Sequence, residues 1–300
     1  MSQQSPIADL SYRNYDGPKS LATARWWVIA KNGLRVSFKK KGLWVLFGMS
    51  SLSYLFMLFM MFMQSFTAEM GGEMLGTFRQ QLVGTYGNAF WPLMIALLVG
   101  SGCIAADNRA NALQVYLAKP MTKKDYLIGK WLYIFLIIFA IYIVPLFIVV
   151  MYRAFDVGFA EFFKSDGRAF FAMPLLAALP AALHASILVG ISAWNKTPWI
   201  VGVIYAGVYF FSTIFAMILA GSISSPSATT DATLRHLSIE GIISGIGQFL
   251  LSAEPRSLTP GMESTARPSA LPLMIIAAIL IVAGVMVARM RIRAVEVVQG

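Results

Sequence analysis

The chain has 300 residues, of which 58% are hydrophobic and only 13% are charged, and its net charge is +10. A soluble domain carries about 25% charged residues, so this composition excludes an ordinary soluble protein. Several apolar runs reach about 20 residues, the length that an α-helix needs to cross a bilayer. The sequence therefore predicts an all-α polytopic membrane protein, in which the single cysteine, Cys103, is a small buried apolar residue.

Residues 1–42 are predicted to form a cytoplasmic tail followed by an amphipathic interfacial helix. The first 20 residues are polar and lack the basic-then-apolar order of a signal peptide. Residues 21–42 combine tryptophans with basic side chains, which is typical of a helix lying on a membrane surface; a plain extension of the first span is the alternative. The expected membrane anchors are Arg25, Trp26, Trp27, Lys31, Arg35 and Lys39.

Residues 43–300 are predicted to form one transmembrane domain of six helices. With the N-terminus inside, the inner segments hold 17 of the 24 basic residues and 5 of the 14 acidic ones. Because basic residues that flank spans stay in the cytoplasm, both termini are expected to be cytoplasmic, and the bacterial inner membrane is the expected location. The basic charge then contacts lipid headgroups rather than nucleic acid. The predicted spans are 43–64, 88–106, 130–151, 170–193, 199–221 and 270–289.

The polar stretch "IAADNRANALQVYLAKPMTKKDYLIGKW" interrupts the apolar sequence between the second and third spans. It predicts a short amphipathic cytoplasmic helix over 108–118, with Asp107 as its N-cap. Thr122 and Asp125 form a capping box that begins the next helix. An apolar patch ringed by polar groups indicates contact with another protein; a helix that only lies at the interface is the alternative.

Two later segments also have local signals. "AWNKTPW" is a tight inner turn with Pro198 at the first position of the following helix, which predicts that the fourth and fifth spans pair closely. Residues 237–252 are apolar but too short to cross the membrane. They predict either a re-entrant hairpin or a helix on the outer surface.

The predicted spans contain few side chains that could support catalysis, proton transfer or ion binding. Between the ends of the spans, His184 is the only Asp, Glu, Lys, Arg or His residue, which disfavours a proton- or sodium-driven transporter. A packing hydrogen bond is favoured for His184 over a proton relay. Six methionines between Met49 and Met70 could bind Cu(I), but ordinary packing is favoured because no cysteine or histidine lies near them. Since no catalytic motif or Walker A sequence is present, we predict no enzyme, no catalytic residue, no metal site and no cofactor bound by this chain.

The polar stretch resembles the cytoplasmic segment of ABC-2-type ABC transporter permeases. Asp107 stands where that family usually has Glu, and Asn111-Ala112 where it usually has Gly-Thr. The six-span layout extends the resemblance to most of the chain. The residues that match the family pattern in order and spacing are Asp107, Arg109, Ala112-Leu113, Pro120, Lys123-Lys124 and Gly129-Lys130.

The resemblance implies a permease subunit whose 107–120 coupling helix docks on a separate ATPase subunit. Two such ATPases would supply ATP and Mg, and a second permease copy or paralogue would complete the assembly. The expected substrate is lipid-like or amphipathic and is moved or extracted; a non-transporting membrane scaffold or accessory subunit is the alternative. The expected docking residues are Asp107, Arg109, Leu113, Tyr116, Leu117, Lys119 and Lys123.

Overall fold

The computed structural model describes residues 24–68, 77–87, 90–112, 121–222, 233–254 and 269–292, and these contain helices and no strand. α2, the α3–α5 segment, α7, α9, α10 and α13 are long and apolar enough to cross a membrane, which confirms the prediction of an all-α protein with six membrane-spanning helices. The predicted tail and the first three residues of the predicted interfacial helix, residues 1–23, lie outside the described residues. The helices are α1 (Arg25–Phe38), α2 (Lys41–Ala68), α3 (Phe78–Gly87), α4 (Phe90–Gly100), α5 (Ala105–Arg109), α7 (Lys123–Val157), α8 (Phe159–Ser165), α9 (Gly167–Trp194), α10 (Pro198–Ser222), the short 3-10 helix η2 (Arg235–Leu237), α12 (Ile239–Leu251) and α13 (Ala270–Arg291).

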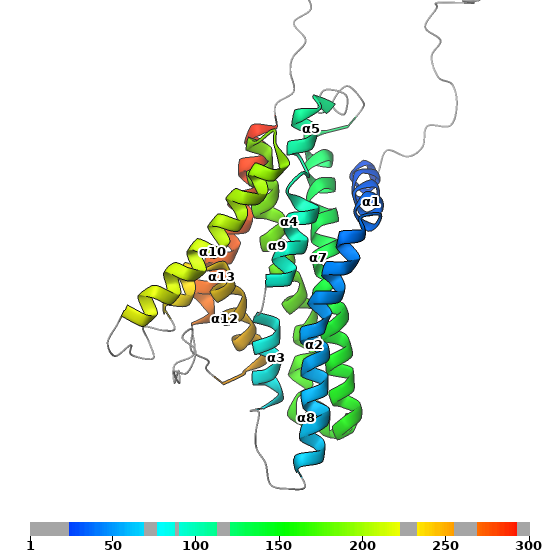
Figure 1. Ribbon diagram of the computed structural model, residues 1–300, viewed down its shortest axis with the longest axis vertical. Coiled ribbons are helices and arrows are strands. Elements are labelled where there is room, and N and C mark those ends of the chain that lie inside the picture. Colours follow the sequence, from blue (N-terminus) through cyan, green and yellow to red (C-terminus); the bar gives the residue numbers. More distant parts are fainter. Residues whose placement is uncertain are drawn as a thin grey trace, which may run out of the picture.

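α7 runs the full height of the bundle, between α5 at one end and α8 at the other (Figure 1). Its 35 residues correspond to about 50 Å, well beyond the roughly 30 Å of a hydrocarbon core. The predicted capping box begins it: Thr122 Oγ1 accepts a hydrogen bond from the Asp125 N–H at 3.1 Å, and Asp125 Oδ2 accepts one from the Thr122 N–H at 3.1 Å. It ends at Gly158, whose φ of 85° is a conformation that glycine adopts without strain.

α9 is the centre of the bundle and packs most closely against α7 and α13. At its crossing with α13 the two backbones touch. A Cβ atom on Gly190 would lie 2.9 Å from the carbonyl oxygen of Gly284, and one on Gly284 would lie 2.6 Å from the carbonyl carbon of Ser186. Only glycine fits at both positions, so α9 and α13 form one tightly packed pair.

α10 begins at Pro198 after a short turn, as predicted. However, it leans away from α9 towards the α8 end, where it packs against α12 and η2 instead (Figure 1). Phe211 is accordingly 71% exposed. The predicted close pairing of the fourth and fifth spans therefore holds for the half of α10 that follows the connecting turn, as far as the contacts of Tyr205 and Tyr209 with His184 of α9.

α1 lies against the α5 end of α7. A Cβ atom on Gly33 would lie 2.6 Å from the ring of Tyr133, and one on Gly129 would lie 2.7 Å from Ile29, so glycines allow the two helices to approach closely. The expected anchors lie in α1 and just after it, and they differ in exposure. Of these, Trp27, Lys31, Arg35 and Lys39 are exposed, and Arg25 and Trp26 are half-buried.

α12 is packed into the bundle, beside α3 and against α9, α10 and α13. Most of its side chains are buried, and a Cβ atom on Gly247 would lie 2.7 Å from the ring of Tyr86. Arg168 of α9 holds its C-terminal end by donating hydrogen bonds to the carbonyl oxygens of Leu250 (2.6 Å) and Phe249 (3.2 Å). This burial does not fit a helix resting on the outer surface, one of the two predicted alternatives.

Candidate functional site

Asp107 joins α5 to α7 at the α5 end of the bundle. Its carboxylate lies 2.7 Å from Lys130 Nζ and accepts a 2.6 Å hydrogen bond from the hydroxyl of Tyr126. Lys130 Nζ also lies 5.4 Å from the centre of the Tyr126 ring. We call Asp107, Tyr126 and Lys130 the α5–α7 clamp. The expected role of Asp107 as an N-cap is wrong, because α5 already begins at Ala105 and the carboxylate is turned towards α7.

The start of α5 is held by Ser192, near the end of α9. Its hydroxyl accepts hydrogen bonds from the N–H groups of Ile104 (3.1 Å) and Ala105 (2.9 Å), and donates one to the carbonyl of Ser101 (3.1 Å). These N–H groups are ones that a helix start otherwise leaves unpaired. Ser192 therefore takes the capping role that the sequence had suggested for Asp107.

Asn108 fixes the other side of α5. Its side-chain amide donates hydrogen bonds to the carbonyls of Ala193 (3.3 Å) and Asn195 (3.1 Å), at the turn between α9 and α10. α5 thus contacts α7, α9 and the α9–α10 turn through side-chain bonds. Sequence reasoning missed Ser192 and Asn108 because each acts on a partner more than 80 residues away, which no local pattern signals.

The chain turns sharply after α5. α5 ends at Arg109, and Asn111 has a φ of 51°, a left-handed conformation that asparagine tolerates better than most residues. Arg109 and Lys123, two expected docking residues, are exposed on either side of the 113–120 segment. The other expected docking residues, Leu113, Tyr116, Leu117 and Lys119, lie outside the described residues.

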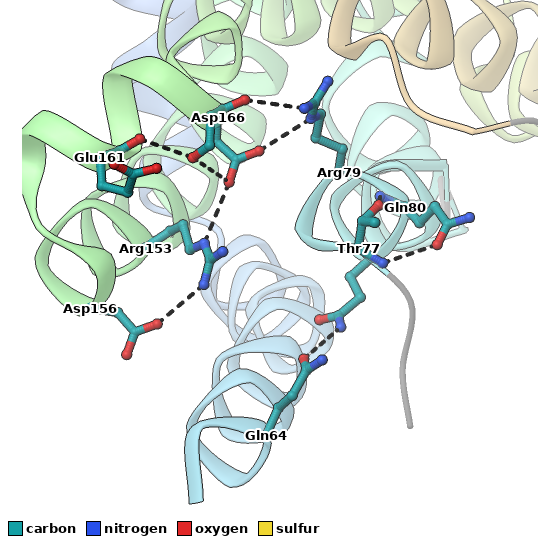
Figure 2. A network of polar contacts seen from close by, with 10 residues as sticks. Gln64, Thr77, Arg79, Gln80, Arg153, Asp156, Glu161 and Asp166 are labelled. Carbon is teal, nitrogen blue, oxygen red and sulfur yellow. Dashed lines mark hydrogen bonds and ion pairs between the residues drawn. The ribbon is translucent and has the colours of Figure 1, made fainter. Parts of the chain in front are cut away.

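A second charged cluster lies at the α8 end (Figure 2). Asp166, only 6% exposed, accepts a 3.1 Å hydrogen bond from Arg79 Nε and lies 3.5 Å from Arg153 Nε. Arg153 also pairs with Asp156 at 3.3 Å, and Arg79 donates to the carbonyl of Ser165 at 3.1 Å. This group of Arg79, Arg153, Asp156 and Asp166, which we call the α8-end ion cluster, joins α3, α7 and the start of α9.

The α8-end ion cluster lines a pocket of about 970 Å³. Gln81 donates to Gln64 across the pocket wall at 3.1 Å, and Gln80 donates to Glu254, so α2 and the end of α12 also take part. None of these residues was predicted as a site. They lie between or at the ends of predicted spans, where charged side chains are ordinary.

His184 is fully buried between α9 and α10. Its Nδ1 lies 2.5 Å from the hydroxyl of Tyr205, and its ring stacks on that of Tyr209 with centroids 6.2 Å apart. This arrangement fits the favoured interpretation of His184 as a residue that packs two spans together.

A comparison with models of protein families identifies a family for this chain. The model of a family described as "ABC-2 family transporter protein" matches residues 27–290, which include the six spans except Arg291, the α5–α7 clamp and the α8-end ion cluster. A comparison with curated protein sequences finds no match. Because the family match covers most of the chain, the protein belongs to the ABC-2 family of ABC transporter membrane proteins.

Proposed function

We propose that the chain is the permease subunit of an ABC transporter, and that separate ATPase subunits dock at its α5 end. Membership of the ABC-2 family supports a permease. The observation that carries the docking proposal is the attachment of the small helix α5 to α7, α9 and the α9–α10 turn through Asp107, Ser192 and Asn108. A five-residue helix has little stability of its own, so these bonds make it move together with the spans.

Force applied at α5 has a continuous route through the subunit. The α5–α7 clamp passes it to α7, and Ser192 passes it to α9. α7 is one unbroken helix that reaches the opposite end, where Arg153 meets Asp166 of the α8-end ion cluster. A rigid-body movement of α7 would therefore act on the pocket at the α8 end.

The docking residues are proposed to divide into two kinds. Leu113, Tyr116 and Leu117 would be the apolar anchors of the ATPase contact, because aromatic residues dominate the centres of interfaces. Arg109, Lys119 and Lys123 would meet an acidic rim and affect association rate more than affinity. Asp107 instead holds α5 in place, since its carboxylate is already paired within the subunit.

The complete transporter would contain two ATPase subunits and a second permease copy or paralogue, with ATP and Mg bound by the ATPases. The α5 end would face the cytoplasm of a bacterial cell, because the segments at that end hold most of the basic residues. The substrate would be lipid-like or amphipathic, since the interiors of the spans carry no Asp, Glu, Lys or Arg to bind a small ion.

The test is a gentle purification of the tagged chain, with bound subunits identified by mass spectrometry. We expect a Walker-motif ATPase with the native chain and its loss with Tyr116→Ala plus Leu117→Ala. The control variant, Phe155→Ala plus Phe159→Ala, removes two exposed aromatic side chains at the opposite end and should keep the ATPase. A folded native chain that brings down other membrane subunits but no ATPase would instead support a scaffold.

A further inference from the structure

The second span is broken close to the α5 end of the bundle. α4 ends at Gly100 and α5 begins at Ala105, and the four residues between them form turns. Within this stretch the Cys103 N–H donates to the carbonyl of Gly100 at 3.1 Å, one residue nearer than an α-helix requires. The chain leaves the α-helical pattern here, and we call residues 101–104 the span-two break.

Side chains from other parts of the chain hold the span-two break. A break in a spanning helix frees backbone carbonyls, which then need donors from neighbouring elements. Lys40 Nζ donates to the carbonyl of Leu98 at 2.9 Å, and the Tyr133 hydroxyl donates to that of Val99 at 3.2 Å. Ser192, which caps α5, donates to a carbonyl within the break itself at 3.1 Å. The shape of the break therefore depends on these three donors.

Two of the donors connect the end of α4 to different elements. Lys40 lies in the elbow between α1 and α2, where the Trp44 indole N–H also donates to the carbonyl of Phe38 at 3.0 Å. Tyr133 belongs to α7, and its ring lies against Gly33 of α1. The end of α4 is thus joined to the elbow by one bond and to α7 by the other.

Gly102 gives the break a freedom that packing does not explain. A Cβ atom on Gly100 would lie 2.6 Å from Leu188, so close packing against α9 accounts for that glycine. A Cβ atom on Gly102 would lie 3.6 Å from Pro198, an ordinary contact distance, and its φ lies outside the left-handed region. A larger residue would therefore fit the observed conformation, whereas glycine also permits others.

The bonds on the two sides of the break differ in strength. On the α5 side, Asp107 is bound by Lys130 at 2.7 Å and by the Tyr126 hydroxyl at 2.6 Å. On the α4 side, the bond from α7 is the neutral 3.2 Å contact of Tyr133 with Val99. Charge-assisted bonds are about twice as strong as neutral ones. If α7 moves, α5 should follow it, and the bond to α4 should break first.

We propose that the span-two break is a hinge, at which α5 turns with α7 and α9 while α4 keeps its place beside α2. Tyr133 and Lys40 are its positioning residues: Tyr133 holds the resting angle, and Lys40 keeps the end of α4 at the elbow. The proposal rests on the proposed function, since an ATPase at the α5 end would supply the movement. A few small residues that absorb a change of backbone angle are common at hinges.

The test is amide hydrogen exchange of the full chain in lipid nanodiscs, resolved by mass spectrometry. Tyr133→Phe and Lys40→Met should each raise exchange in residues 99–105 by about threefold or more, because each removes one bond that holds the break. Phe keeps the ring on α1, so the temperature of unfolding should change little. Tyr152→Phe, further along α7, and Lys39→Met, beside Lys40, are the matched controls and should exchange like the native chain.

Gly102→Ala tests the hinge from the opposite direction. The added methyl group fits beside Pro198, and alanine restricts backbone rotation. Exchange in the break should therefore fall, after correction for the intrinsic rates of the new sequence, and the temperature of unfolding should stay the same or rise. Gly207→Ala, with nothing within 4 Å of the added Cβ atom, is the control and should leave the break unchanged.

Three outcomes would overturn the proposal. Exchange equal to that of its control, in either positioning variant, would mean that the side chain does not hold the break. Unchanged exchange in Gly102→Ala would mean that the break is not a site of rotation. A rise spread evenly over α4, α7 and α9 would mean a general loss of packing. Because exchange is measured without an ATPase, its result is distinguishable from that of the docking test.

Discussion

Asp107 and Lys130 stand 23 positions apart in the sequence, yet their charged groups lie 2.7 Å apart. Gly129, the residue before Lys130, is one of the points where α1 approaches α7 closely. One short stretch of α7 thus holds α5 on one side and α1 on the other. This gives a physical reason for the acidic residue before the 113–120 segment and for the Gly-Lys pair after it.

The α5–α7 clamp predicts strong coupling between Asp107 and Lys130. Asp107→Asn and Lys130→Met should each lower the free energy of unfolding by about 1–3 kcal/mol, because each change removes one partner of a mostly buried ion pair. The double variant should lose much less than the sum of the two. Thermal unfolding of all four proteins gives the coupling energy.

Amide hydrogen exchange tests whether breaking the Asp107–Lys130 pair loosens α5 in particular. In Asp107→Asn, amide exchange should rise in residues 104–112 and stay unchanged around Gly284, far from the clamp. Additive losses of stability, or exchange that rises equally throughout the bundle, would show that the pair does not hold α5.

The contact between α9 and α13 predicts that Gly284 tolerates no side chain. Gly284→Leu should destabilise the bundle by about 1–3 kcal/mol or more, because the new side chain would overlap the backbone around Ser186. Gly207→Leu is the matched control, since nothing lies within 4 Å of a Cβ atom at that position on α10. Thermal unfolding compares them; equal midpoints would contradict the tight helix pair.

The described elements show which features the sequence can reveal. The spans follow from length and hydropathy, and the capping box of Thr122 and the helix start at Pro198 follow from side-chain chemistry within four residues. Local rules suffice in these cases because the partners are neighbours in the chain. α12 was recognised as apolar and short, but its place depends on α3, α9, α10 and α13.

The candidate sites depend on distant partners instead. Asp107 has the chemistry of an N-cap, but Ser192 occupies that role and Lys130 attracts the carboxylate. Tyr86 and Tyr142 lie 56 positions apart in the sequence, and only the fold shows that the centroids of their rings are 5.7 Å apart. Arg79 and Asp166 are 87 positions apart, so their bond could not be foreseen without relating α3 to the start of α9.

The α8-end ion cluster predicts that its two acidic residues differ in importance. Asp166→Asn should lower the free energy of unfolding by about 2–4 kcal/mol, because it is buried and serves both Arg79 and Arg153. Asp156→Asn should cost less than about 1 kcal/mol, since its partner among the described residues is Arg153, one partly exposed helix turn away. Thermal unfolding of the two variants checks this order, and equal losses would contradict a cluster centred on Asp166 (Figure 2).

Glu240, in the first turn of α12 and outside the six spanning helices, predicts a dependence of stability on pH. Burial raises the pKa of its carboxyl above the usual 4.5. The folded state therefore favours the protonated form, so its contribution to stability is fully present below the ordinary pKa and is lost as the pH rises through the raised one. Glu240→Gln should consequently unfold at a higher temperature than the native chain at neutral pH, and at a similar temperature in acid. Unfolding midpoints measured across this range test the prediction, with Glu254→Gln as the control; an equal difference at every pH would show that ionisation of Glu240 is not the cause.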